Sequence, residues 1–161
     1  KSQRIFTHMW CAEEAVKLYT SIFPDSQVFR AVTLPNESPS GPAGSVKVID
    51  FTLFGQRFQA FSVPQSQLNQ SNNTPMSLVV LCKDQQELDC YWNRLLEAGG
   101  KALGCGWIED SFGVRWQIVP AILEDLMSST DVARVKRVSE AMLKMVKLDI
   151  AELQCAFDGS N

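Results

Sequence analysis

The chain has 161 residues, of which 45% are hydrophobic and 20% are charged, and its formal net charge is −3. This length and composition fit one ordinary domain, or two small repeats that share a core, and they exclude a disordered chain. The acidic balance disfavours a nucleic-acid surface, and we find neither an apolar run near the ~20 residues of a membrane helix nor a secretion-signal pattern. We therefore expect a cytoplasmic protein that binds neither nucleic acid nor a membrane.

The first half of the sequence predicts the element order β-α-β-β-β. Residues 12–23 place their apolar side chains on one helical face, and Pro24 ends that helix. Three prolines and two glycines mark 35–44 as a loop, and Gly55 joins two strands as a hairpin. The predicted elements are a strand over 4–10, the helix over 12–23, and strands over 26–34, 45–54 and 56–63.

The second half predicts the same order again, after a polar, amide-rich linker over 64–75. Asp84 and Glu87 have the spacing of a capping pair at a helix start, and Gly99 and Gly100 mark its end. The predicted elements are a strand over 76–82, a helix over 84–100, short strands over 101–105, 106–110 and 114–120, and amphipathic helices over 122–129, 132–145 and 149–157. We expect a single domain over 1–161, made of module one (1–63), the linker (64–75), module two (76–120) and C-terminal helices (121–157).

The fourth strands of the two halves repeat one pattern, GQRFQAFSVP at 55–64 and GVRWQIVP at 113–120. Because side chains alternate across a strand, each copy has an apolar face and a face that mixes arginine, glutamine and an apolar side chain. The mixed faces consist of Arg57, Gln59 and Phe61 in the first copy and of Arg115, Gln117 and Val119 in the second. Such a duplicated mixed face is typical of a small-molecule site, and the repeat predicts an α+β fold in which both halves share a core.

Five cysteines stand at irregular spacings and form no C-x-x-C pair, which favours free thiols in a reducing compartment over disulfides. Apolar neighbours in the sequence predict that three of them are buried, namely Cys82, Cys90 and Cys155.

Several tracts of the chain, in the right order, resemble one family. They are THMW (7–10), AEEAVKLYTSIFPDS (12–26), SLVV (77–80), CGWIEDSFGVRWQIVP (105–120) and SEAMLKMVKLDIAELQ (139–154). The chain resembles the PhnB-like branch of the vicinal oxygen chelate superfamily, which includes glyoxalase I, bleomycin-resistance proteins and extradiol dioxygenases. The resemblance implies two βαβββ modules that form a glyoxalase-like cup for a small molecule, completed by a second subunit in a homodimer.

In superfamily members with metal chemistry, ligands lie on the first and fourth strands of each module, and a His and a Glu from each module are common. The resemblance places these positions at Gln59 and Gln117 on the fourth strands, at Ser77, and at Phe6 or Thr7. Neutral amides and a hydroxyl are poor ligands for a divalent ion, so we expect no metal or other cofactor. His8, the single histidine, is the one candidate metal ligand, and the alternative is a hydrogen-bonded core or cavity residue.

The resemblance and the strand faces together predict which residues line the cavity: Phe6, His8, Arg57, Gln59, Phe61, Ser77, Val79, Arg115 and Gln117. The arginines either bind an anionic ligand or pair with Asp50, Asp110 or a partner subunit, and the sequence leaves both open. Trp92 and Trp116 are predicted core residues, whereas the places of Trp10 and Trp107 stay open.

Three functions are consistent with this pattern, and whether the protein is an enzyme is undecided. The first is a small-molecule binding protein without the usual catalytic metal. The second is a metal-dependent enzyme of the glyoxalase or dioxygenase type that uses His8, and the third sequesters a drug or metabolite. The branch is often labelled 3-demethylubiquinone-9 3-methyltransferase, but Gly104-Cys105-Gly106 lacks the context of a nucleotide-binding loop and predicts a bend between strands.

Overall fold

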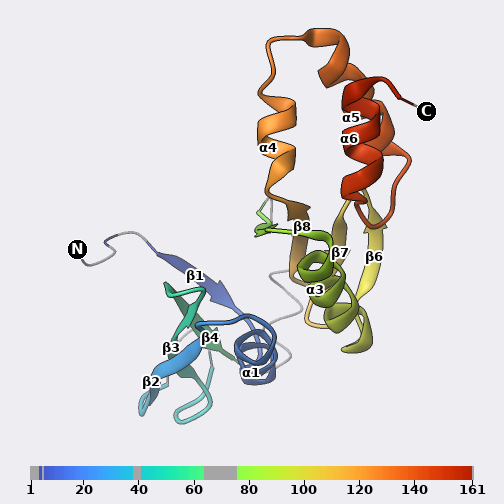
Figure 1. Cartoon of the computed structure of the whole chain (residues 1–161). Helices are drawn as coiled ribbons and strands as arrows, with labels where there is room; N and C mark the ends of the chain where they lie inside the picture. Colours follow the sequence, from blue (N-terminus) through green and yellow to red (C-terminus); the bar gives the residue numbers. More distant parts are fainter. Residues whose placement is uncertain (1–3, 5, 38–40, 64–75, 161) are drawn as a thin grey trace. The chain divides into compact units, whose positions relative to one another are not determined.

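The computed structural model describes residues 4, 6–37, 41–63 and 76–160, which Figure 1 draws in colour. The chain divides into two compact units, Lys1–Thr74 and Pro75–Asn161. Both contain the predicted order β-α-β-β-β, and the second adds helices, so the α+β class with two βαβββ modules is confirmed. The predicted linker over 64–75 lies outside the described residues, and a core shared by the two halves stays a prediction.

In the first unit, helix α1 (Glu13–Ile22) packs against one face of a four-stranded sheet (Figure 1). The sheet order is β1-β4-β3-β2, with β1 parallel to β4 and the other neighbours antiparallel. Alternation turns Ile49, Phe51 and Ala60 toward the helix, and each is at most 2% exposed. The strands are β1 (Thr7–Trp10), β2 (Gln27–Thr33), β3 (Lys47–Leu53) and β4 (Gln56–Ser62).

The predicted hairpin at Gly55 is confirmed as a tight turn between β3 and β4. Leu53 pairs with Gln56, and the two residues between them, Phe54 and Gly55, have φ of 51° and 73°. Two positive φ values in succession match the twist of a two-residue hairpin. A Cβ atom at position 55 would lie 2.7 Å from Asp25 Oδ2, so a side chain there would require the Asp25 carboxylate to shift.

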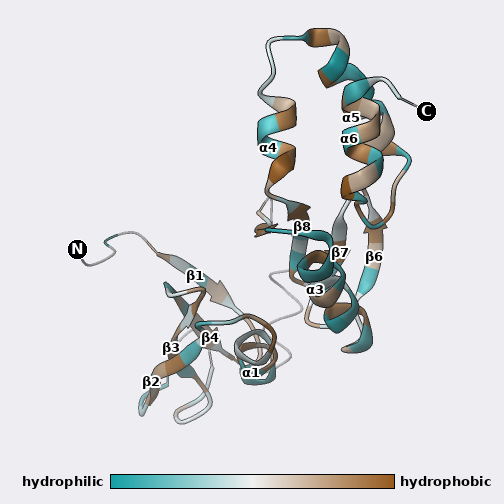
Figure 2. Ribbon diagram, in the orientation of Figure 1, coloured by the Kyte–Doolittle hydropathy of each residue, from teal (hydrophilic) through white to brown (hydrophobic). Residues whose placement is uncertain are grey.

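Strand β2 lies at one edge of the first sheet, and every residue of it is exposed. Figure 2 shows hydrophobic residues along this strand, where Val28, Phe29 and Val32 are 45%, 49% and 47% exposed. An edge strand with unpaired backbone groups and apolar side chains can pair with another chain.

The second unit repeats this arrangement, with sheet order β5-β8-β7-β6 and β5 parallel to β8. Helix α3 (Gln85–Glu97) begins at Asp84, whose carboxylate accepts a hydrogen bond from the Glu87 backbone N–H at 2.8 Å, as the capping pair predicts. Trp92 and Trp116 are 4% and 2% exposed, which confirms both as core residues. The strands are β5 (Leu78–Cys82), β6 (Lys101–Gly104), β7 (Trp107–Glu109) and β8 (Arg115–Pro120).

Three helices follow β8, namely α4 (Ile122–Met127), α5 (Val132–Leu143) and α6 (Ile150–Asp158). Helix α5 packs on α6, and Arg137 donates hydrogen bonds to the carbonyl oxygens of Ala156 and Phe157 at 2.8 and 2.9 Å. These carbonyls belong to the last turn of α6, where a cation also complements the helix dipole. No helix of the described residues is long and apolar enough to cross a membrane.

The Gly104-Cys105-Gly106 tract forms the predicted bend between β6 and β7, with φ values of 105°, 53° and 82°. The backbone N–H groups of Cys105 and Gly106 donate to the carbonyls of Met145 and Val146, both at 2.8 Å. The bend therefore ties the segment before α6 to the sheet.

All five cysteines are free, but the predicted burial of Cys90 and Cys155 is wrong because both are exposed. Helix periodicity gives the reason: Leu88, Tyr91, Trp92 and Leu95 are the buried face of α3, and Cys90 lies outside it. On strand β5 the two-residue period buries Cys82 together with Val80 and leaves Leu81 exposed, so an apolar nearest neighbour does not decide burial on a strand either.

Candidate functional site

A row of four polar side chains crosses the first sheet on the face opposite to α1. The strand register aligns Arg30 with Asp50, Asp50 with Gln59, and Gln59 with His8, one residue from each strand. Arg30 Nε donates to Asp50 Oδ2 at 2.7 Å, and Gln59 Nε2 donates to Asp50 Oδ1 at 3.1 Å. His8 Nδ1 lies 2.9 Å from Gln59 Oε1. We call this set, Arg30–Asp50–Gln59–His8, the polar row.

Asp50 is the anionic centre of the polar row and is only 1% exposed. Burial by itself would raise the pKa of Asp50, but hydrogen bonds from Arg30, Arg57 and Gln59 together outweigh burial and hold the pKa below its ordinary value. The Arg57 bond joins Nη2 to Oδ1 at 3.1 Å. Asp50 is therefore a carboxylate at neutral pH, and all its hydrogen bonds are accepted ones.

Aromatic rings flank the polar row on the same face. The Arg57 guanidinium lies 3.9 Å from the centroid of the Phe6 ring, a cation–π contact. The His8 ring meets the edge of Phe61 at 4.8 Å, and Trp10 lies 6.1 Å from Phe61. The fold thus gathers all five module-one residues predicted for the cavity, which are Phe6, His8, Arg57, Gln59 and Phe61.

The equivalent row in the second unit is apolar apart from its glutamine. Gln117 aligns with Val79 on β5 and with Trp107 on β7, so these residues take the places of His8 and Asp50. Val79 is 53% exposed, and Gln117 Nε2 donates to Ser77 Oγ at 2.9 Å. The sequence predicts the mixed face of β8 but not the loss of the carboxylate and imidazole.

The register also decides which first-strand residue corresponds to Ser77. Gln59 aligns with His8 and Gln117 aligns with Val79, so the residue two positions before each, just ahead of the strand, is Phe6 in one unit and Ser77 in the other. Thr7 aligns with Phe58 on the opposite face. Of the two residues that the sequence left open, Phe6 is the equivalent.

The two repeated arginines have different partners. Arg57 bonds to the buried Asp50, as one of the sequence alternatives proposes. Arg115 pairs with Glu109 at 3.3 Å, and both side chains are exposed. Asp110, the other partner considered, is 4% exposed and accepts a hydrogen bond from Trp116 Nε1 at 2.9 Å, so its role is structural.

The residues at the four metal-ligand positions of the superfamily do not fit a divalent ion. They are Phe6, Gln59, Ser77 and Gln117, none of which is anionic, and Gln59 already engages its oxygen and its nitrogen within the polar row. Among the residues that the structure describes, no group of three or more His, Cys, Asp or Glu side chains is placed to hold a metal ion.

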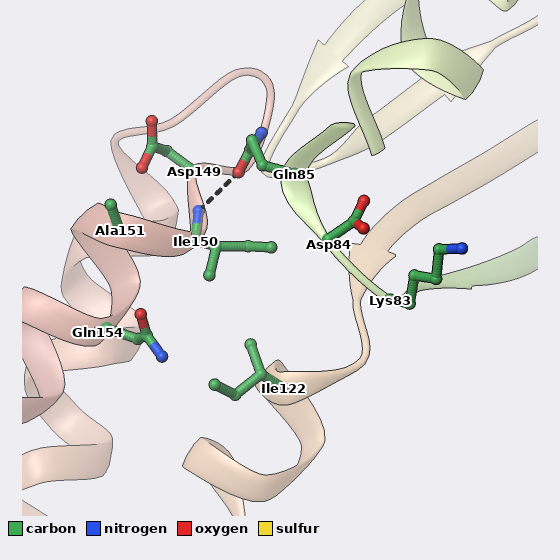
Figure 3. Close-up of a pocket in the computed structure, with 8 residues that line it drawn as sticks. All are labelled: Lys83, Asp84, Gln85, Ile122, Asp149, Ile150, Ala151 and Gln154. Carbon is green, nitrogen blue, oxygen red and sulfur yellow. Dashed lines mark hydrogen bonds between the residues drawn. The ribbon is translucent and has the colours of Figure 1, made fainter. Parts of the chain in front are cut away.

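The second unit also contains a pocket of about 470 Å³ at the start of helices α3, α4 and α6 (Figure 3). Gln85 lines it and connects the start of α3 to the segment at the start of α6: Oε1 accepts from the Ile150 backbone N–H at 2.9 Å, and Nε2 donates to the Leu148 carbonyl at 3.1 Å. The sequence pattern identifies Asp84 only as a helix cap and does not indicate the pocket, because three separate segments form it. The lining residues are Lys83, Asp84, Gln85, Ile122, Asp149, Ile150, Ala151 and Gln154.

The family model described as 3-demethylubiquinone-9 3-methyltransferase matches residues 3–119. The chain belongs to this family. It is 32% identical to the PhnB protein from Bacillus cereus, with a TM-score of 0.57 over 71% of this chain and 97% of that one. The predicted PhnB-like membership is thereby confirmed.

Two further solved structures are similar to this PhnB-like chain. A protein from Pseudomonas aeruginosa, 18% identical, matches with a TM-score of 0.52 over 71% of this chain and 95% of its own, which shows the fold alone. A protein from Staphylococcus aureus is 32% identical over 73% of this chain and 95% of its own, with a TM-score of 0.32. No curated protein matches the chain.

Proposed function

We propose that this PhnB-like protein binds a small aromatic molecule on the polar-row face of its first unit, without a divalent metal. The observation that carries the proposal is the gathering of Phe6, Phe61 and Trp10 around His8 and Arg57. Aromatic side chains beside a few oriented polar groups are the usual composition of a small-molecule site. The exposed His8 ring and the half-buried Arg57 supply the polar contacts.

Trp10 gives this proposal a direct readout, because it is 39% exposed and is the one tryptophan of residues 1–74. Small aromatic compounds such as 4-methylphenol should quench tryptophan fluorescence excited at wavelengths that the ligand does not absorb. The response should vanish in Trp10→Phe and persist in Trp107→Phe, its matched control in the second unit. A response that depends on Trp107 alone would place the ligand elsewhere and contradict the proposal.

The metal-free part of the proposal needs a separate test. Neutral ligands at the superfamily positions support it, and elemental analysis of protein purified without chelators should find no stoichiometric Zn, Ni, Mn or Fe. A stoichiometric metal that disappears in His8→Ala would instead favour the metal-dependent glyoxalase or dioxygenase reaction. Mass spectrometry of the bound compound after incubation then separates a sequestering protein, which returns it unchanged, from an enzyme.

We do not propose a methyltransferase activity for this protein, although the family model has that description. Gly104-Cys105-Gly106 forms a β6–β7 bend that packs on the segment before α6, whereas a nucleotide-binding glycine loop links a parallel strand to a helix. Transfer of a labelled methyl group from S-adenosylmethionine to a phenol acceptor by the pure protein would contradict this position.

We also propose that the protein is a homodimer. The exposed apolar residues of the edge strand β2 support an interface between copies of the chain. Light scattering after gel filtration should give twice the chain mass, and Phe29→Lys should shift the mass toward the monomer. A monomeric wild type would refute this.

A further inference from the structure

The polar row restricts how the Gln59 amide can point. Asp50 is a buried carboxylate with a lowered pKa, and it can only accept hydrogen bonds. Gln59 must therefore turn its NH₂ group toward Asp50 Oδ1, which lies 3.1 Å away, because the reverse orientation would bring two acceptor oxygens together. The Gln59 oxygen then faces β1.

The orientation of Gln59 in turn decides which nitrogen of His8 carries the proton. Gln59 Oε1 is an acceptor, and it lies 2.9 Å from His8 Nδ1. Nδ1 must donate, so the neutral ring has its proton on Nδ1 and its lone pair on Nε2. Among the described residues, Nε2 has no hydrogen-bond partner, and the His8 side chain is exposed.

We infer that Asp50 is a positioning residue which, through Gln59, fixes the His8 tautomer so that Nε2 is presented to a ligand as a hydrogen-bond acceptor. This inference rests on the proposed function only for the nature of the ligand. A compound seated on this face then offers a hydroxyl or N–H donor to Nε2, while its ring packs against the aromatic side chains. A phenol has both features.

The tautomer can be measured on the protein alone, since the single histidine makes every imidazole signal a His8 signal. The experiment uses tag-free, ¹⁵N-labelled protein at alkaline pH, where an imidazole is neutral. Two-bond ¹H–¹⁵N spectra should show a protonated Nδ1 and an unprotonated Nε2. The opposite assignment, or two nearly equal nitrogen shifts, would overturn the inference.

Variants test the hydrogen-bonded chain from Asp50 through Gln59 to His8. Gln59→Leu removes the middle member while leaving Asp50 and its arginines in place, so the two His8 nitrogen shifts should move toward each other. Asp50→Asn should act in the same direction, because a neutral amide no longer dictates the Gln59 orientation. Gln117→Leu, the equivalent change in the second unit, should leave the His8 signals unaltered. A Gln59→Leu spectrum identical to that of the wild type would show that Gln59 does not fix the His8 tautomer. If Gln59→Leu changes the spectrum and Asp50→Asn does not, the positioning role of Asp50 is refuted.

A matched pair of probes tests the ligand chemistry. 4-Methylphenol and its methyl ether, 4-methylanisole, have similar shapes, but only the phenol donates a hydrogen bond. The phenol should shift the Nε2 resonance and bind about fivefold more tightly, the effect of one hydrogen bond. Equal binding overturns the donor requirement. Binding of neither compound contradicts the proposed function, and the tautomer measurement then decides the positioning role of Asp50 independently.

Discussion

Asp50→Asn should destabilise the first unit more than any other single loss of charge in the polar row. The substitution keeps the side-chain volume and removes the negative charge to which Arg30 and Arg57 both bond. Removal of one partner from a fully buried pair costs about 3–5 kcal/mol. Because the two arginine side chains are 56% and 31% exposed, water replaces part of the lost interaction. We therefore expect a loss of about 2 kcal/mol in the free energy of unfolding.

The matched control is Glu109→Gln, which removes the carboxylate from the Arg115 pair in the second unit. Both side chains of that pair are exposed, at 53% and 38%, and exposed pairs contribute about 0–1 kcal/mol. Urea denaturation followed by circular dichroism measures both variants. Equal destabilisation by the two substitutions would refute the view that burial of Asp50 makes its interactions strong.

The pH dependence of the Asp50 effect has a defined sign. The folded state lowers the pKa of Asp50, so its contribution to stability is complete above the ordinary carboxyl pKa of about 4 and disappears as the pH falls through the lower folded-state value. The difference in the free energy of unfolding between wild type and Asp50→Asn should therefore be constant at neutral pH and shrink below about pH 4. A difference that grows in acid would contradict the ionised state of Asp50.

Three further predictions concern the second unit. Gln85→Ala should weaken the docking of α6 by about 1–3 kcal/mol and speed hydrogen exchange at the Ile150 amide. The control is Gln86→Ala, which should change neither, because Gln86 is exposed. Gly106→Ala should cost more stability in thermal unfolding than Gly104→Ala, because both have positive φ but only a Cβ at 106 meets a side chain, at 3.0 Å. Burial, followed by the nearby carboxylates of α3 and its cap, raises the pKa of Cys82 to about 12, so alkylation at pH 8 with mass-spectrometric readout should leave Cys82 unlabelled while both exposed cysteines react.

The contents of the polar row could be read only partly from the sequence. Strand alternation places Arg57 and Gln59 on one face, because that rule depends on the local chain alone. In a hairpin with a two-residue turn, residues at equal distances before and after the turn lie opposite each other. Leu53 and Gln56 flank the turn at Phe54 and Gly55, so Asp50, three residues before Leu53, lies opposite Gln59, three residues after Gln56. This turn is the signal in the sequence for the place of Asp50, whereas charge alone indicates Asp50 only as a possible partner of the repeated arginines.

The partner of Gln59 on β1 could not be predicted in the same way. Strands β1 and β4 are parallel and about 50 residues apart in the chain, so no turn sets their register. The same reason explains why Phe6 and Thr7 could not be separated before the register of His8 with Gln59 was known.

The two copies of the repeat have kept the glutamine and changed both of its neighbours, and this change determines what each amide can do. In the first unit a carboxylate holds the Gln59 nitrogen, so its oxygen meets an imidazole. In the second unit the residue opposite Gln117 on β7 is Trp107, and the Gln117 nitrogen donates to the Ser77 hydroxyl. An amide beside a carboxylate must point its nitrogen toward that carboxylate, so its oxygen faces the next strand. An amide between a tryptophan and a valine has no such neighbour to fix its orientation. The proposed recognition of a ligand by a directed hydrogen bond therefore belongs to the first unit.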